Sequence, residues 1–417
     1  MKNRQNIFLW ALYDFANSFI FITFFLYFSQ WIIADRNMPD LWFNLCFAIS
    51  SLALLFTAPF IGIKLDKKWR NIHGLRLTTF AIIFFYTLTA LSALKNYDIL
   101  ALIFFTVGVY FFALSFTFYN PLLNIISLPE KRGAVSGFGI AGNFLGNISA
   151  LVLAMPFAAG KINLFSGTGR TETLLPAIAA FFVFSLPMLL FFKEPEKETF
   201  DISPSESRSE SCFSKTKKLF QEPDLLMFLV AFAFFNGAII TIANNFPIIL
   251  EKVWNTPDTV KTLILLAMTT ASIIGSITAG HMTDRWNGKR ILIGIIIGWV
   301  FIVPLSAIML DFTYYIVTAI IAGFLIGANI SVSRAVMSML VPNEHRNLGF
   351  SYFNIMERAS TLIGPIVWGL VVSGFVSFGS ARYRIALVSM AILISLSLPF
   401  LTKIKFTRSV VSVSRLI

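Results

Sequence analysis

The sequence predicts an all-α membrane protein with about twelve transmembrane helices, arranged as two six-helix bundles related by pseudo-two-fold symmetry. Hydrophobic residues make up 57% of the 417 residues and charged residues only 13%, about half the charged fraction of ordinary soluble proteins. The apolar residues gather in runs of about 20, the length that crosses a bilayer as a helix. A short basic hairpin occurs twice, about half the chain apart, as expected for a duplicated bundle.

Polar loops separate the apolar runs of the first half. Lys2 and Arg4 precede the first run, a basic segment at 64–70 separates the second from the third, and Pro129 opens the loop before the fifth. We expect each run to be a helix, because each is too long for a soluble strand. The predicted spans are 7–33, 42–63, 75–94, 99–126, 134–157 and 173–192.

The longest polar stretch, residues 193–223, divides the chain into halves. It is rich in serine, proline and mixed charge, so it cannot bury a core and is expected to be a flexible linker. We therefore predict an N-terminal bundle over 1–192 and a C-terminal bundle over 224–417. The spans predicted in the second half are 225–250, 259–280, 290–309, 313–340, 348–375 and 384–402.

The net charge of +12 is distributed unevenly. Most of the 33 lysines and arginines fall in the loops on the side of both termini, which places both termini in the cytosol by the positive-inside rule. The charge therefore sets orientation and does not indicate nucleic acid. We expect a multi-pass protein of the bacterial inner (cytoplasmic) membrane that contacts the lipid bilayer and is monomeric.

The sequence contains no pattern that predicts a cofactor or a metal site. The only cysteines, Cys46 and Cys212, lie in a span and in the central loop, and the three histidines lie in separate loops. Neither a metal site nor a disulfide is predicted. The chain has no P-loop and no catalytic constellation, so we predict no cofactor, no catalytic residues and no enzymatic activity.

Each basic hairpin has the pattern Gly-x-x-x-Asp followed by Lys or Arg. A second repeated pattern supports the duplication, because Pro129 and Gly133 follow the fourth span much as Pro342 and Gly349 follow the tenth. These loops resemble those of the major facilitator superfamily, and the resemblance covers the whole chain. In that family the loop aspartate closes the cytosolic gate by pairing with basic groups and a helix N-terminus of the other half. The resemblance implies gate residues at Gly62, Asp66, Gly280, Asp284, Arg285, Lys289 and Arg290. The alternative is that the basic residues only anchor helix ends.

A narrower resemblance lies in the first span, at residues 10–19. This stretch, WALYDFANSF, resembles the opening signature of the vacuole effluxer family, the autophagy-related amino-acid exporters and their bacterial relatives. Ser333-Arg334, and Gly364-Pro365 preceded by Arg358, are similar to that family's tenth and eleventh helices. The family pattern has Gln where this chain has Ile330 and Lys where it has Arg358.

Charged residues inside the spans are candidate substrate or proton sites, because an unpaired charge in a bilayer is costly. Asp14 shares a helix face with Asn17 and Ser18 and is either a site for a substrate amine or proton, or a helix-packing residue. Arg334 is either functional or extends toward the membrane surface.

Glu357 and Arg358 are adjacent, so their side chains point about 100° apart. Arg358 would hold a substrate carboxylate and Glu357 a proton. The alternative is a structural ion pair, with Glu357 and Arg334 as one candidate pair.

Asparagines form a second set of candidates. They fall in the first, fourth, seventh and tenth spans, the helices that line the central cavity in the superfamily, and the candidates are Asn17, Asn120, Asn124, Asn236 and Asn329. The alternative is that these amides join helix pairs.

The predicted function is secondary active transport of a small solute, with amino acids as the leading class and co-transported protons. Asp14 and Arg358 would meet the amine and the carboxylate of such a solute. The alternatives are a transporter of a peptide, drug or siderophore, and a membrane receptor or scaffold that transports nothing.

Overall fold

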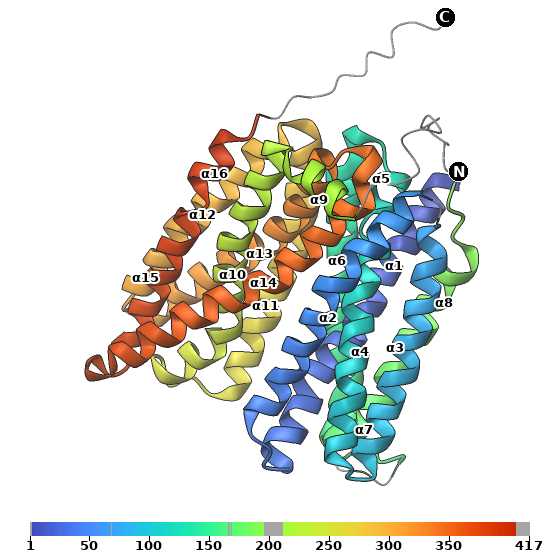
Figure 1. The fold of residues 1–417 in the computed structure, drawn as a ribbon. Helices are drawn as coiled ribbons and strands as arrows, with labels where there is room; N and C mark the ends of the chain where they lie inside the picture. The colour runs from blue at the N-terminus through green and yellow to red at the C-terminus, as the bar shows by residue number, and fades with distance from the viewer. Residues whose placement is uncertain (1, 68, 166, 168, 196–211, 406–417) are drawn as a thin grey trace, which may run out of the picture.

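The computed structural model describes residues 2–67, 69–165, 167, 169–195 and 212–405. Among these residues, twelve helices are long and apolar enough to cross a membrane, and their positions confirm the twelve predicted spans. The first and last spans begin and end at the same end of the molecule (Figure 1), which we call the terminus end. The opposite end is called the far end.

The first half contributes six spans. The first is α1 (Lys2–Thr23), which continues as two π-helical turns, η1 (Phe24–Phe28) and η2 (Trp31–Asp35). The others are α2 (Asp40–Lys67), α3 (Asn71–Leu94), α4 (Asp98–Tyr119) with α5 (Leu122–Ile126), α6 (Arg132–Ala158) after the 3-10 turn η3 (Pro129–Lys131), and α8 (Leu174–Phe191) after α7 (Gly169–Glu172). Pro121 separates α4 from α5, as expected of a residue that cannot continue a helical ladder.

The second half contributes the other six. They are α10 (Pro223–Lys252), α11 (Asp258–Arg285), α12 (Gly288–Ile308), α13 (Phe312–Leu340), α14 (Arg346–Gly374) after η4 (Asn343–His345), and α15 (Ala381–Ser395) with α16 (Leu398–Lys403), η5 (Val376–Phe378) lying between α14 and α15.

Much of the predicted linker, residues 196–211, lies outside the described residues. After it comes a helix that the sequence reasoning missed, α9 (Cys212–Phe220). Leu219 of this helix is buried, and Phe220 packs against Tyr352 of α14. The end of the linker is therefore ordered and rests on the second half.

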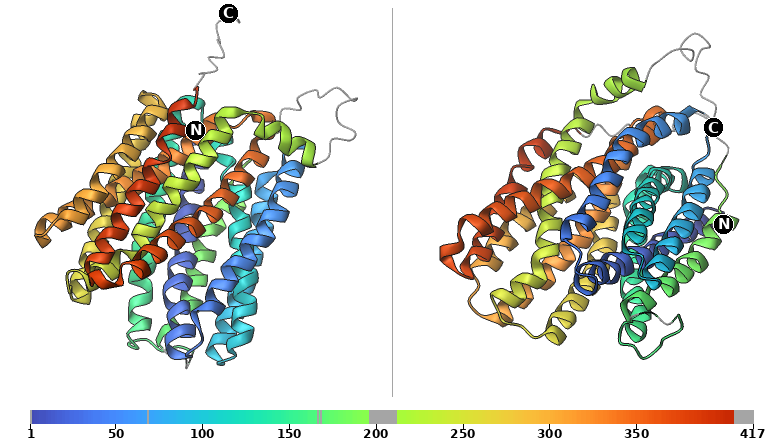
Figure 2. Two further views of the ribbon diagram at one scale, coloured as in Figure 1. Left: turned by 60° about the vertical axis from the view of Figure 1, so that its left-hand side comes forward. Right: turned by 60° about the horizontal axis from the view of Figure 1, so that its bottom comes forward.

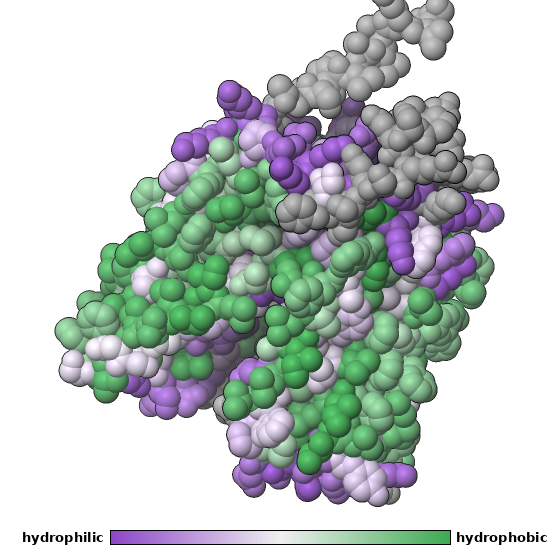
Figure 3. Space-filling view, viewed as in Figure 1, coloured by the Kyte–Doolittle hydropathy of each residue, from purple (hydrophilic) through white to green (hydrophobic). Residues whose placement is uncertain are grey.

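Apolar residues cover much of the face shown in Figure 3, between the two polar ends of the molecule. Phe60, Leu77 and Phe301 are each more than half exposed, which suits a surface that faces lipid. Aromatic residues also fill the interior, where Trp10, Tyr13 and Trp299 are fully buried.

Two helix pairs make the most extensive packing between the halves. α6 packs against α11, and α2 packs against α14, so the fifth span meets the eighth and the second meets the eleventh. The two halves lie together at the terminus end and diverge toward the far end (Figures 1 and 2). The space-filling view shows a hollow between them that opens at the far end (Figure 3).

Candidate functional site

Asp66, in the last turn of α2, binds the first turn of α14 in the other half. One carboxylate oxygen accepts hydrogen bonds from the backbone nitrogen of Asn347 (2.8 Å) and from its side-chain amide (2.7 Å), and the other accepts one from the backbone nitrogen of Leu348 (3.1 Å). A helix N-terminus has unpaired N–H groups and a partial positive charge, so a carboxylate is stabilised there.

Asp284, in the last turn of α11, makes the corresponding contact with α6. Its two oxygens accept hydrogen bonds from the backbone nitrogens of Gly133 (2.6 Å) and Ala134 (2.7 Å). Each half therefore supplies one aspartate that caps a helix of the other half, at the terminus end.

The glycines of both hairpins lie where the halves approach most closely. A Cβ at Gly62 would stand 2.6 Å from the Ser351 hydroxyl oxygen and 2.9 Å from the Leu348 Cα. A Cβ at Gly280 would stand 3.1 Å from the Gly137 Cα. A larger residue at either position would force the two halves apart.

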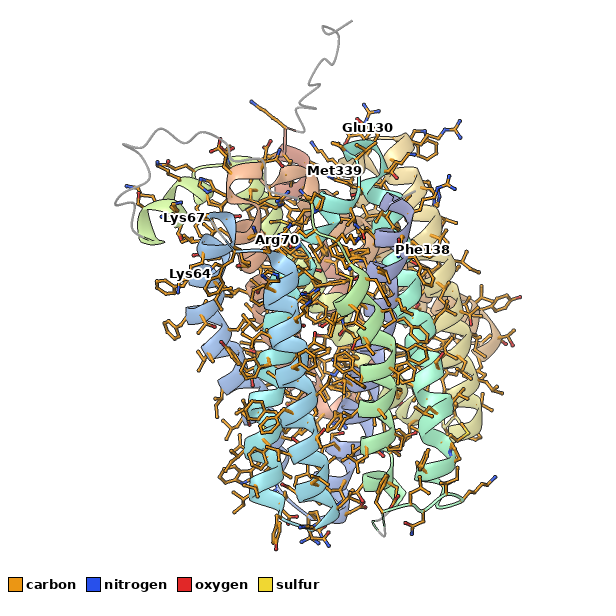
Figure 4. The ribbon with its side chains drawn as sticks, turned by 90° about the vertical axis from the view of Figure 1, so that its right-hand side faces the viewer. Lys64, Lys67, Arg70, Glu130, Phe138 and Met339 are labelled. Atoms are coloured by element: carbon orange, nitrogen blue, oxygen red, sulfur yellow. The ribbon has the colours of Figure 1, made fainter. Side chains whose placement is uncertain are left out.

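The three basic residues proposed for the gate are either bound within their own half or exposed. Lys289 donates to the backbone carbonyls of Thr402 (2.7 Å) and Ile404 (2.6 Å), so it ties α12 to the end of α16 within its own half. Arg285 and Arg290 are exposed. Figure 4 shows Lys64, Lys67 and Arg70 around the end of α2, at the same end of the molecule as Glu130.

Other polar side chains join the halves at this end. Arg132 (2.7 Å) and Asn124 (2.9 Å) both donate to the backbone carbonyl of Ser338, near the C-terminus of α13, where a cation is favoured. Asn120 donates to the side-chain oxygen of Asn354 (2.8 Å). In this conformation Asn120 and Asn124 hold the halves together and do not face an open cavity.

Asp14 and Arg334 form a buried ion pair between α1 and α13, with 2.9 Å between Nη1 and Oδ2. Their side chains are 3% and 6% exposed. Arg334 also donates to the hydroxyl (3.2 Å) and the backbone carbonyl (3.0 Å) of Ser136, and its guanidinium lies over the Trp10 ring, 4.4 Å from the ring centroid. Arg334 thus pairs with Asp14 and not with Glu357, the partner that the sequence suggested.

A residue of the first-span stretch 10–19, Trp10, forms part of the contact surface for Arg334. Trp10 stacks on Tyr119 with ring centroids 4.9 Å apart, and the Tyr119 hydroxyl donates to the Trp10 backbone carbonyl (2.8 Å). Both aromatic side chains are fully buried. Trp10 and Tyr119 of the N-terminal half therefore form a packed surface on which Arg334 of the C-terminal half rests.

Two of the candidate residues have local structural contacts. The Ser18 hydroxyl donates to the backbone carbonyl of Asn143 (2.7 Å), which joins α1 to α6. The Asn236 amide donates to the Ser360 hydroxyl (2.8 Å), which joins α10 to α14. Both contacts lie within one half.

Asn17 and Asn329 are buried without hydrogen bonds from their side chains to any described residue. A buried amide without a partner costs roughly 1–3 kcal/mol. The binding of water or a polar solute by these two amides stays a prediction.

Glu357 and Arg358 lie two turns beyond the contact of α14 with α2. Glu357 is exposed and Arg358 is partly exposed. Arg358 lines a pocket together with α1 residues that begin at Ile20, six residues or about 9 Å of helix beyond Asp14. Asp14 is paired with Arg334 in this conformation, so the binding of one zwitterion by Asp14 and Arg358 stays a prediction.

Some interface residues escaped the sequence reasoning. Ser338 acts through its backbone carbonyl, which no residue type in the sequence marks, and Asn347 binds Asp66 through both its backbone nitrogen and its side-chain amide. Trp10 lay inside the family-like stretch 10–19, but nothing in the sequence indicated that Trp10 and Ser136 would both meet Arg334. Among the described residues, no group of three or more histidine, cysteine or acidic side chains is arranged to hold a metal ion.

The comparisons with known proteins agree on one superfamily. The chain is 24% identical to an uncharacterized MFS-type transporter, YxiO, of Bacillus subtilis over 86% of both chains. It is 28% identical to autophagy-related protein 22 of Vanderwaltozyma polyspora over 44% of this chain and 37% of that protein. The fold is similar to the crystal structure of the E. coli fucose:proton symporter FucP, with a TM-score of 0.72 and 15% identity over 97% of this chain and 98% of that chain.

The model of the family described as "Vacuole effluxer Atg22 like" matches residues 127–414. This match covers more than half of the chain, and it includes the Gly133 and Asp284 contact as well as Arg334 and Arg358. The chain therefore belongs to the vacuole effluxer Atg22-like family of major facilitator superfamily transporters.

Proposed function

We propose that this transporter carries a small solute by alternating access, with amino acids as the first class to test. Two bundles, residues 1–192 and 224–417, would rock about the contact between them, and residues 193–223 would connect them. The solute would bind between the bundles, where a site can open to one end at a time.

The observation that carries this proposal is the asymmetry of the interface. Asp66, Asp284 and Arg334 all bind across the halves toward the terminus end, whereas the hollow opens at the far end (Figure 3). The contacts of Asp66 and Asp284 are made with N–H groups that water satisfies equally well when the halves separate. Closure at the terminus end is therefore reversible, as alternating access requires.

The basic loops support an orientation with both termini in the cytosol of a bacterium, in its inner membrane. In that orientation the structure is closed to the cytosol and open to the outside. We propose a monomer, because each bundle finds its partner within the same chain. Asp14 and Glu357 are the proposed sites of a co-transported proton, since the first is released when Arg334 withdraws and the second already lies exposed.

An amino acid carries one charge of each sign, and the exposed Glu357 and the partly exposed Arg358 supply the complementary pair. Because successive side chains point about 100° apart, a zwitterion would reach both only by lying across α14. The second arrangement, with Asp14 at the amine and Arg358 at the carboxylate, would require Asp14 to leave its ion pair with Arg334.

The test is counterflow into proteoliposomes with a mixture of labelled amino acids, beside an Asp14→Asn variant and a Glu357→Gln variant. We expect wild-type accumulation, with loss in Glu357→Gln at an unchanged unfolding temperature or in Asp14→Asn that is still folded at the temperature of the assay. A stable wild-type protein that accumulates no amino acid would overturn the amino-acid assignment. The same assay would then be run with labelled peptides, drugs and siderophores.

A further inference from the structure

We propose that Glu357 is the second partner of Arg334, and that Arg334 passes from Asp14 to Glu357 when the terminus end opens. Glu357 is then a positioning residue of the transport cycle. This proposal rests on the proposed alternating access and deepens it, because it says how a buried arginine keeps a counter-charge in both conformations.

Opening at the terminus end separates the two members of the buried ion pair. Asp14 belongs to α1 in the first half, and Arg334 belongs to α13 in the second. Their charged atoms are 2.9 Å apart, so the halves cannot move apart at this level without breaking the pair. A buried charge that loses its partner is strongly unfavourable. Arg334 therefore needs another acceptor in the open conformation.

Glu357 offers an acceptor within the same half as Arg334. The two residues lie on α13 and α14, which pack against each other in the second half, so separation of the halves does not part them. The Glu357 carboxylate interacts electrostatically with both Arg334 and Asp14. The Glu357–Arg334 pair that the sequence suggested would thus form in the other conformation of the transporter.

The contacts between α4 and α14 place Glu357 close to the ion pair. Asn354, one turn before Glu357, accepts a hydrogen bond from the Asn120 amide of the first half (2.8 Å). Tyr119, the residue before Asn120, interacts electrostatically with both members of the ion pair. Glu357 therefore lies about 4.5 Å of helix beyond this layer of contacts, toward the far end, where the hollow opens (Figure 3).

The Glu357 side chain has no fixed partner in this conformation. It is exposed, and no salt bridge between residues that the structure describes includes it. Arg358 is adjacent, but residues i and i+1 of a helix do not face each other. Glu357 is therefore available to bind an arginine that leaves Asp14.

The exchange leaves one carboxylate without Arg334 in each conformation. Glu357 is that carboxylate when the terminus end is closed, and Asp14 is that carboxylate when it is open. Loss of Asp14 therefore removes the acceptor of the closed conformation, whereas loss of Glu357 removes the acceptor of the open one. The two substitutions should shift the equilibrium between the conformations in opposite directions.

The experiment measures the distance across the terminus end by electron spin resonance, in the full-length protein in nanodiscs. Spin labels replace Lys131 of the first half and Arg290 of the second, in a cysteine-free background. The double substitution Asp66→Asn and Asp284→Asn weakens closure and should populate a longer distance. The quantity compared between variants is the ratio of the long-distance to the short-distance population.

Glu357→Gln, added to the double substitution that weakens closure, should lower this ratio by about tenfold or more, because Arg334 then has no acceptor in the open conformation. Glu357→Asp should recover part of the open population. Glu251→Gln is the matched control, since it removes an exposed carboxylate of the same half, and it should leave the ratio unchanged.

Asp14→Asn should raise the ratio even when both loop aspartates are intact. The fold of each variant is checked by circular dichroism and by monodisperse elution. In an Arg334→Gln background, Glu357→Gln should no longer change the ratio, because its effect acts through the arginine. A role of Glu357 in stability alone would produce neither the opposite shifts nor this dependence on Arg334.

The outcomes separate the exchange from the function on which it rests. An open population that Glu357→Gln leaves unchanged would overturn the exchange and leave alternating access standing. A folded Asp14→Asn variant that keeps the wild-type ratio would do the same if the loop substitutions do open the terminus end. No long distance in any of these variants would contradict alternating access itself, and the exchange with it.

Discussion

Among single residues, Arg334 makes the densest set of contacts between the halves. It forms an ion pair with Asp14, binds Ser136 through two atoms and lies over Trp10. A buried ion pair is costly to break by removing one partner, because the other charge is left without compensation. Opening at the terminus end therefore requires a proton, water or solute to replace the partner that leaves.

Removing either member of this pair should destabilise the protein by about 3–5 kcal/mol. We expect Asp14→Asn and Arg334→Gln each to lower the unfolding temperature, and the double variant to lose less than the sum of the two. The measurement is thermal unfolding of all three variants, with Arg36→Gln as control. Arg36 pairs with Asp98 on a partly exposed surface, so its loss should cost about 1 kcal/mol or less. Strictly additive shifts would show that Asp14 and Arg334 do not interact in the membrane.

Sequence reasoning identified both charges in this pair but not the pairing. Asp14 and Arg334 are far apart in the chain, and several carboxylates were available as partners. The choice depends on how the socket of Trp10, Tyr119 and Ser136 is assembled in three dimensions, which no spacing in the sequence expresses.

Among elements, the two hairpins bring helices of opposite halves into close contact through glycine. Gly62 is needed because α2 approaches α14 so closely, and a Cβ there would meet the Ser351 hydroxyl and the Leu348 backbone. The repeated Gly-x-x-x-Asp pattern pointed to these loops because glycine and aspartate act at fixed separation on one helix face.

Gly62→Ala should destabilise the protein by roughly 1–3 kcal/mol, because a crowded helix contact must shift. Gly369→Ala is the matched control, since Gly369 also lies inside a helix and no atom would contact its Cβ. There alanine should stabilise by up to about 1 kcal/mol through helix propensity. The check is thermal unfolding of both variants, and a neutral or stabilising Gly62→Ala would contradict the close contact.

Helix α9, the π-helical turns after α1 and the contact of Lys289 could not be predicted from sequence patterns. Helix α9 follows a serine-rich stretch and is held by contacts of Leu219 and Phe220 with distant helices. The π-helical turns after α1 have the same phenylalanine-rich composition as an ordinary span. Lys289 matched the gate motif but binds α16, because a charged side chain can turn toward either half.

At the scale of the whole molecule, twelve helices and their duplication followed from the length of the apolar runs and from two repeated loops. The direction in which the cleft opens did not follow, because both conformations of a rocking transporter share one sequence. The structure supplies this conformation. The contacts of Asp66, Asp284 and Arg334 close the terminus end, and the hollow between the halves opens at the far end (Figure 3).

The most direct test of alternating access measures two distances in one protein by electron spin resonance. One label pair would replace Lys131 and Arg290 at the terminus end, and the other Tyr97 and Leu310 at the far end, with Cys46→Ser and Cys212→Ser as background. Each pair is compared with and without the double substitution Asp66→Asn and Asp284→Asn, which weakens closure. We predict that the terminus-end distance lengthens while the far-end distance shortens. A terminus-end change without a far-end change, or no change at either end, would contradict alternating access.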